Sequence, residues 1–193
     1  MKFILLITLL FSGFLSFAQS AAFHYKTSSQ QYFRIRPGTD KFYHSINLRT
    51  QDIVTNTLFT IDENKVTFKI PEDGFYEITA MYHFNANTSN VRYNRGGVNF
   101  GIVQTIDKGG IYVAATRMSF DKSTQDKFID IYVQPTIVYL QKDVEIYPAI
   151  SSGLMANPLL GCEIGCEKKN KNCTSFEFKI KRISNEKSFQ RYY

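Results

Sequence analysis

The chain has 193 residues, a formal net charge of +6 and no Trp. That length fits one domain, and a mild positive charge without a recognisable basic motif argues against a nucleic-acid partner. Tyr and Phe are abundant, at 12 and 17 residues, and both favour strands because their flat side chains pack on a pleated surface. The composition therefore favours a single β domain.

Residues 1–18 have the pattern of a secretory signal peptide. A basic start at Lys2 precedes an apolar run from Phe3 to Phe17, and small residues end it at Ser16 and Ala18. The run is shorter than the roughly 20 residues that span a bilayer, and no later segment has the length and hydropathy of a membrane helix. We predict cleavage after Ala18 and a secreted or extracytoplasmic protein.

The mature chain is predicted to contain three parts. Residues 19–41 are polar overall and are expected to form a loose N-terminal segment, and residues 185–193 are expected to fray as a C-terminal tail. Between them, residues 42–184 form the predicted domain.

Period-two alternation is clearest on either side of the Pro71–Gly74 turn. Residues 65–70 place alternate apolar side chains on one face, and residues 75–84 do the same from Tyr76 to Phe84. A turn with Pro and Gly between two such segments predicts that they pair as a hairpin.

More segments follow at a similar rhythm, and no long helical periodicity appears. Pro135 interrupts one segment and predicts a bulged or edge strand there, or two strands. The other candidate strands are residues 98–102, 111–120, 129–133, 136–140, 144–150 and 176–181, with weaker candidates at 32–36, 42–48 and 57–61. Eight to ten short strands predict an antiparallel sandwich or barrel.

One stretch carries a family pattern, Phe68-Lys69-Ile70-Pro71-Glu72-Asp73-Gly74-Phe75-Tyr76. It resembles the Phe-x-x-Pro-x-x-Gly-x-Tyr motif of the globular head of complement C1q and its relatives in the tumour-necrosis-factor-like superfamily. Residues 138–146 and 175–180 are similar to that family's late corner and closing strand. The resemblance covers residues 42–183. The chain departs from the family at Asp143 and Lys179, where Gly is common, and no collagen-like stalk precedes the domain.

The resemblance implies an all-β jelly roll of about ten strands that associates around a threefold axis. Members of the family bind proteins, glycans or charged surfaces, and some hold calcium near the axis, so calcium is suggested here by analogy only. The residues add some support, because aromatic or aliphatic side chains occupy both faces at Phe75/Tyr76, Tyr132/Val133 and Tyr139/Leu140. A second apolar face needs a cover, either a neighbouring subunit or a long loop.

Catalytic patterns are not evident. His24 lies in the segment expected to be loose, His83 points outward from its strand, and no histidine pair has helical metal-site spacing. Ser151-Ser152-Gly153 lacks the flanking glycines of a nucleophile elbow. We therefore expect no catalytic residue, no bound cofactor and no metal, and we interpret the chain as a non-enzyme.

Three cysteines lie in the connection before the last strand. In an exported protein they should oxidise, and Cys166–Cys173 is the favoured bridge, with Cys162–Cys173 as the alternative. The remaining thiol could cross-link subunits. A three-thiolate metal site is disfavoured because no fourth ligand lies nearby. The loop between the cysteines is a candidate partner contact, or simply a solvated loop, and its tip carries Lys168, Lys169 and Lys171.

The leading hypothesis is a secreted homotrimeric recognition module whose ligand is a protein, a glycan or a cell surface. One rival is a structural surface or extracellular-matrix component that is cross-linked through the cysteine loop. A third reading is a carbohydrate-active enzyme on a sandwich fold, although no carboxylate pair is nominated for it.

Overall fold

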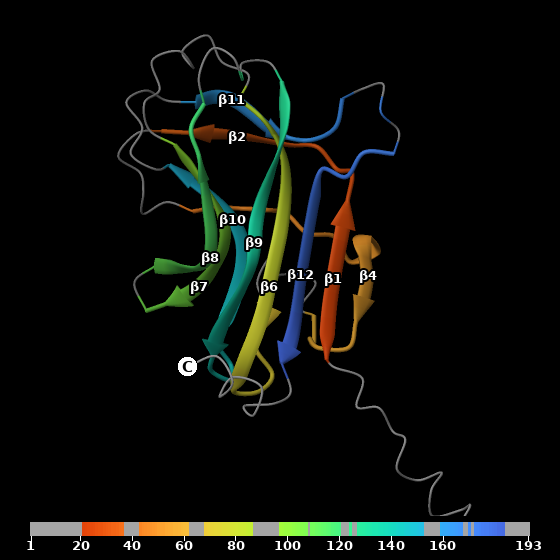
Figure 1. The fold of residues 1–193 in the computed structure, drawn as a ribbon, viewed down its shortest axis with the longest axis vertical. Coiled ribbons are helices and arrows are strands. Elements are labelled where there is room, and N and C mark those ends of the chain that lie inside the picture. Colours follow the sequence, from red (N-terminus) through yellow and green to blue (C-terminus); the bar gives the residue numbers. More distant parts are fainter. Residues whose placement is uncertain are drawn as a thin grey trace, which may run out of the picture.

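The computed structural model describes residues 21–36, 43–61, 68–86, 97–107, 109–120, 124, 127–152, 159–167, 170 and 172–183. Within these residues, twelve strands and one short 3-10 helix, η1 (Thr50–Asp52), form two antiparallel sheets that pack over one core (Figure 1). The predicted all-β antiparallel sandwich is therefore confirmed.

The seven-stranded sheet has the order β2, β11, β6, β12, β1, β4, with β9 pairing along the other edge of β6. Its strands are β1 (Ala22–Thr27), β2 (Gln31–Ile35), β4 (Ile53–Asn56), β6 (Gly74–Asn85), β9 (Phe128–Leu140), β11 (Leu159–Ile164) and β12 (Phe176–Ile183). The first and last strands lie side by side, as a jelly roll requires.

The five-stranded sheet has the order β3, β10, β7, β8, and β5 also pairs with β10. Its strands are β3 (His44–Ser45), β5 (Phe68–Lys69), β7 (Val98–Ile106), β8 (Gly109–Met118) and β10 (Glu145–Ser152).

Alternating side chains fill the core as the sequence predicts. On β6 the predicted inward set is buried from Tyr76 to Phe84, and on β12 Phe176, Phe178 and Ile180 are buried. The Tyr82 hydroxyl donates to the Gly101 carbonyl at 2.8 Å, so this buried polar group has a partner. Burial raises the pKa of Tyr82 well above its ordinary value.

The N-terminal segment is not loose where the structure describes it. Residues 22–27 form β1, which pairs with β12 on one side and β4 on the other, and residues 31–35 form β2. Phe23 and Tyr25 are buried in the core. The predicted boundary at residue 42 is therefore wrong. Only three side chains of β1 point into the core, and polar residues surround them in the sequence. The strand is therefore too short to show a clear alternation.

The predicted hairpin across Pro71–Gly74 is also wrong. β5 pairs with β10 in one sheet, whereas β6 belongs to the other, so the turn crosses between sheets. Strands from opposing sheets send alternate residues into the same core, so periodicity alone does not identify their partner. The Tyr76 hydroxyl donates to the Glu72 carbonyl at 2.7 Å, and this hydrogen bond stabilises the turn that passes from one sheet to the other.

The corner before β10 keeps the conformation that glycine favours. Asp143 has a φ of 64°, a left-handed value that short polar side chains tolerate. Its N–H donates to the Ile70 carbonyl at 2.8 Å, and the Lys142 N–H donates to Asp73 Oδ1 at 2.6 Å. Asp143 therefore keeps the corner at a position where glycine is common in the family that this stretch resembles.

We predict that Asp143→Ala lowers the free energy of unfolding by about 1 kcal/mol, because alanine is strained at positive φ. Asp143→Gly is the matched control and should leave stability unchanged or slightly higher. Urea unfolding followed by fluorescence measures both. Equal losses in the two variants would mean that the side chain, and not the backbone, stabilises the corner.

The Asp52 carboxylate fastens η1 to β1. Its Oδ2 accepts hydrogen bonds from Tyr25 Oη at 3.2 Å, Thr27 Oγ1 at 2.8 Å and Arg49 Nε at 2.8 Å. Burial alone would raise the pKa of Asp52, but the hydrogen bonds and the charge of Arg49 outweigh it and lower the pKa below the ordinary 3.8. The ionised form is therefore the one that stabilises the fold.

A carboxyl with a lowered pKa stabilises the fold above its unfolded-state value and loses that contribution as pH falls through the folded value. We predict that Asp52→Asn is about 1–2 kcal/mol less stable at pH 7. The gap to wild type should close as the pH falls below about 3.8. Unfolding curves at several pH values test this, with exposed Asp107→Asn as the control. A gap that stays constant down to pH 2 would refute the assignment.

Candidate interaction site

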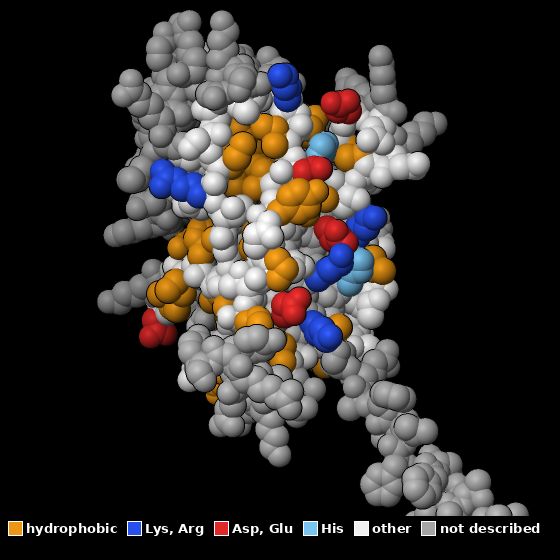
Figure 2. Space-filling model, viewed as in Figure 1, with side chains coloured by type: hydrophobic (Ala, Val, Ile, Leu, Met, Phe, Trp, Pro, Cys, Tyr) orange, Lys and Arg blue, Asp and Glu red, His pale blue; other side chains and the backbone are white. Residues whose placement is uncertain are grey.

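The outer face of the seven-stranded sheet exposes large apolar side chains over β6 and β9. Figure 2 shows hydrophobic side chains gathered on this face. We define the aromatic strip as Phe75, Met81, Phe128, Tyr132, Ile137 and Tyr139. Tyr132 and Tyr139 are each 54% exposed and Ile137 is 47% exposed. The strip runs along two paired strands, with Phe75 opposite Tyr139 and Met81 opposite Tyr132.

A bulge in β9 keeps the strip on one face. Ile78 pairs with Thr136 but Ala80 pairs with Val133, so Gln134 and Pro135 together lie opposite Thr79. The extra residue reverses the alternation, and Tyr132 and Tyr139 therefore share the outer face although seven positions separate them. The irregularity predicted at Pro135 is confirmed as a bulge.

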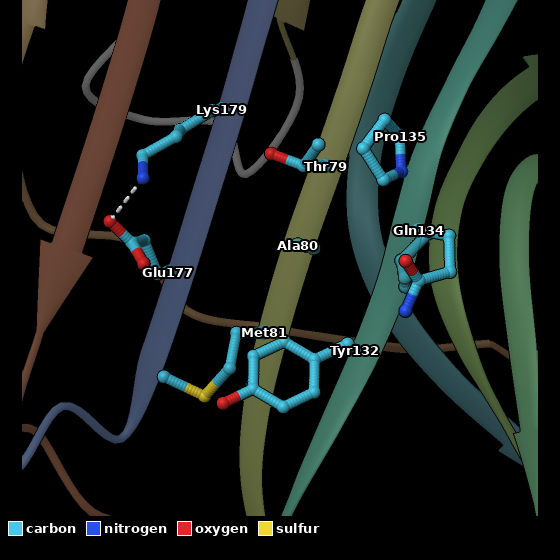
Figure 3. Close-up of a pocket in the computed structure, with 9 residues that line it drawn as sticks. Thr79, Ala80, Met81, Tyr132, Gln134, Pro135, Glu177 and Lys179 are labelled. Carbon is cyan, nitrogen blue, oxygen red and sulfur yellow. Dashed lines mark ion pairs between the residues drawn. The ribbon is translucent and has the colours of Figure 1, made fainter.

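The bulge leaves a shallow hollow of about 240 Å³ in the middle of the strip. Figure 3 shows that Met81 and Tyr132 lie on one side of it and Pro135 on another. Its far side carries an ion pair in which Lys179 Nζ lies 2.8 Å from Glu177 Oε1. The hollow is lined by apolar side chains together with the polar Thr79 and Gln134, and its charged groups lie at one margin. The sequence analysis did not predict it.

Two histidine–carboxylate pairs lie on the same face. His83 on β6 places Nδ1 2.6 Å from Asp130 Oδ1 and stacks on Phe128 with ring centroids 4.9 Å apart. His24 on β1 places Nε2 2.7 Å from Glu177 Oε1. His83 points outward as predicted. His24, expected in a loose segment, is held in the sheet.

The Glu177 carboxylate is shared between two partners, Lys179 and His24. Burial alone would raise its pKa, but the hydrogen bonds and charges of Lys179 and His24 outweigh burial and lower it. The carboxylate therefore stays ionised at the margin of the hollow.

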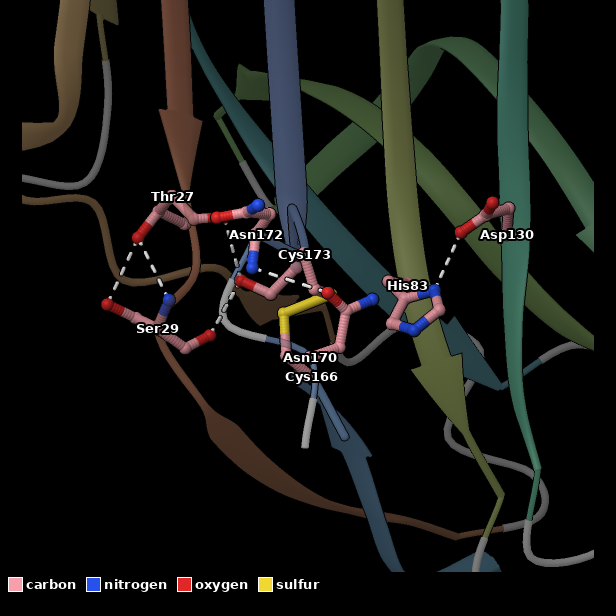
Figure 4. The surroundings of a disulfide bond; sticks show 9 residues. Thr27, Ser29, His83, Asp130, Cys166, Asn170, Asn172 and Cys173 are labelled. Atoms are coloured by element: carbon pink, nitrogen blue, oxygen red, sulfur yellow. Dashed lines mark hydrogen bonds and ion pairs between the residues drawn. A yellow bond between two sulfur atoms is a disulfide. The ribbon is translucent and has the colours of Figure 1, made fainter. Parts of the chain in front are cut away.

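The disulfide closes the neck of the β11–β12 connection. Cys166 and Cys173 are bonded, with Cα atoms 5.8 Å apart, and this confirms the favoured pairing. Next to them, the Gly165 N–H donates to the His83 carbonyl at 3.1 Å, and the His83 N–H donates to the Ser175 carbonyl at 2.9 Å. Figure 4 shows the disulfide on one side of His83 and Asp130 on the other. The neck of the loop is thus anchored on β6, at one end of the strip.

Cys162 carries a buried thiol whose Sγ donates to the Phe33 carbonyl at 3.3 Å. Burial raises the pKa of this thiol to about 12. Because Cys162 is buried, its sulfur is not accessible for the cross-link between subunits that the sequence analysis considered. The disulfide likewise excludes a three-thiolate metal site. Lys168, Lys169 and Lys171 lie outside the described residues.

Within the described parts of the chain, no three His, Cys, Asp or Glu side chains are grouped as metal ligands. The same parts contain no helix with the length and hydropathy needed to cross a bilayer.

The strand order and the crossing between sheets define a TNF-like jelly roll. The structure of Eiger TNF from S. frugiperda matches with a TM-score of 0.53 over 86% of this chain and 94% of that chain, at 10% sequence identity. No family model matches the sequence, and no curated protein matches it. The likeness establishes a TNF-like fold and does not single out the C1q branch of the expected superfamily.

We predict that iodoacetamide at pH 8 labels no cysteine in the native protein and one cysteine in concentrated urea. Only Cys162 has a thiol, and it becomes reactive when unfolding exposes it. Mass spectrometry of the labelled chain counts the adducts, and prior reduction in urea should raise the count to three. Labelling of the native protein would show that Cys162 is accessible, and three adducts without reduction would disprove the disulfide.

Proposed function

We propose that the protein is an extracytoplasmic, non-enzymatic recognition module that assembles as a homotrimer through the aromatic strip. The exposure of Tyr132, Ile137 and Tyr139 on one sheet face carries the proposal. Contiguous apolar side chains on a soluble protein mark an interaction surface, since water contact with them is unfavourable. Tyrosine suits such a surface because its ring is apolar and its hydroxyl is polar.

The TNF-like fold supports a binding module of TNF or C1q type. The motif resemblance implies threefold association, and a copy of the chain would supply the cover that the second apolar face needs. A cyclic trimer joins two different patches at each contact, so the strip would receive another part of the neighbouring copy. The hollow over Pro135 can receive one of its side chains.

Export is supported by the signal-like residues 1–18 and by the Cys166–Cys173 disulfide, since disulfides persist in oxidising compartments. The ligand in this proposal is a protein or a glycan. The disulfide-closed loop, whose sequence includes Lys168, Lys169 and Lys171, remains the candidate contact from the sequence analysis. The matrix alternative loses its cross-linking thiol because Cys162 is buried.

We predict that Tyr132→Lys converts the trimer to a monomer without changing the circular dichroism spectrum. The new charge would have to be buried at the contact, whereas in the monomer it stays in water. Sedimentation velocity of the processed protein, starting after Ala18, measures the oligomer.

Tyr32→Lys is the matched control, because Tyr32 is 69% exposed on β2 and lies outside the strip. This variant should stay trimeric. A wild-type protein that sediments as a monomer at tens of micromolar would refute the proposal, and so would a trimeric Tyr132→Lys variant.

A further inference from the structure

The His83–Asp130 pair lies inside the aromatic strip. Its members come from adjacent strands, β6 and β9, and stand opposite each other in the ladder with 2.6 Å between Nδ1 and Oδ1. Phe128 stacks on the imidazole ring, and the Tyr132 hydroxyl donates to Asp130 Oδ2 at 3.4 Å. Any partner that covers Phe128 and Tyr132 therefore also covers this pair.

The groups around His83 come from three elements. β9 contributes the Asp130 carboxylate and the Tyr132 hydroxyl, and the β11–β12 connection contributes the backbone of Gly165 and Ser175. On β6 itself, Met81 is the preceding outward side chain. Among the described residues, the Asp130 carboxylate is the charged group paired with the ring.

The second pair on the face differs in its charge. Glu177 faces His24 on β1 but is also bonded to Lys179, so this carboxylate already has a permanent cation when the imidazole is neutral. Lys26 stands opposite Glu177 in the ladder. Protonation of His24 is therefore not needed to balance the charge there.

We propose that assembly through the strip takes up protons at His83, so that the trimer is tighter near pH 6 than near pH 8. Histidine is the side chain that ordinarily changes charge between pH 5 and 8. With a neutral imidazole, the pair carries a net charge of −1 that must leave water when the strip is covered. With an imidazolium, the pair is neutral overall, and its burial costs less. This inference rests on the proposed trimer and adds its regulation by pH.

Sedimentation equilibrium at pH 6 and pH 8, at constant ionic strength, tests the proposal. We expect the wild-type association constant to rise by about tenfold or more at pH 6. Asp130→Asn should reverse the sign of this pH dependence. The variant should associate more tightly at pH 8, because acid then creates an unpaired buried cation. His83→Gln should associate equally at both values.

His24→Gln is the matched control on the same face and should keep the strengthening in acid. Circular dichroism verifies that each variant is folded, and if His83→Gln is not, the sign reversal in Asp130→Asn decides the question. Equal wild-type association at both pH values would overturn this inference and leave the trimer standing. A wild-type protein that stays monomeric at both values would overturn the proposed function itself.

Discussion

Two residues of β9 stand opposite one residue of β6, and both faces of the seven-stranded sheet depend on this mismatch. The step at Gln134 and Pro135 reverses the alternation, so Val138 and Leu140 continue the core while Ile137 and Tyr139 continue the outer strip. Pro135 has no N–H to offer to a ladder, which suits it to a bulge. Without the extra residue, Tyr139 would point into the core and the strip would end near Tyr132.

The anchored loop and the interaction face meet at His83. At this residue β6 passes from pairing with β12 to pairing with β11, and its backbone bonds both ends of the disulfide-closed connection. Its side chain stands in the strip beside Asp130. The disulfide-closed connection and the His83–Asp130 pair therefore meet at one position of β6.

Local patterns predicted much of this arrangement. Alternation identified the inward faces of β6 and β12, Pro135 marked the bulge, and the spacing of cysteines favoured the observed disulfide. Part of the candidate site was visible as well, because Tyr132 and Tyr139 stood out as aromatics on a second face. The hollow and the His24–Glu177 pair were not predicted, because each requires neighbours from different strands.

The amino-acid order alone determined which side chains of each clear strand face the core, because a period of two is a local property of the backbone. Tertiary structure alone decided which strands pair. His24 meets Glu177 across 153 positions, and β5 joins β10 instead of β6, although its alternation suits either sheet. Strand pairing depends on the packing of the whole core. A short strand such as β1 is held in its sheet because Phe23 and Tyr25 pack between the two layers, and the local sequence pattern does not predict this.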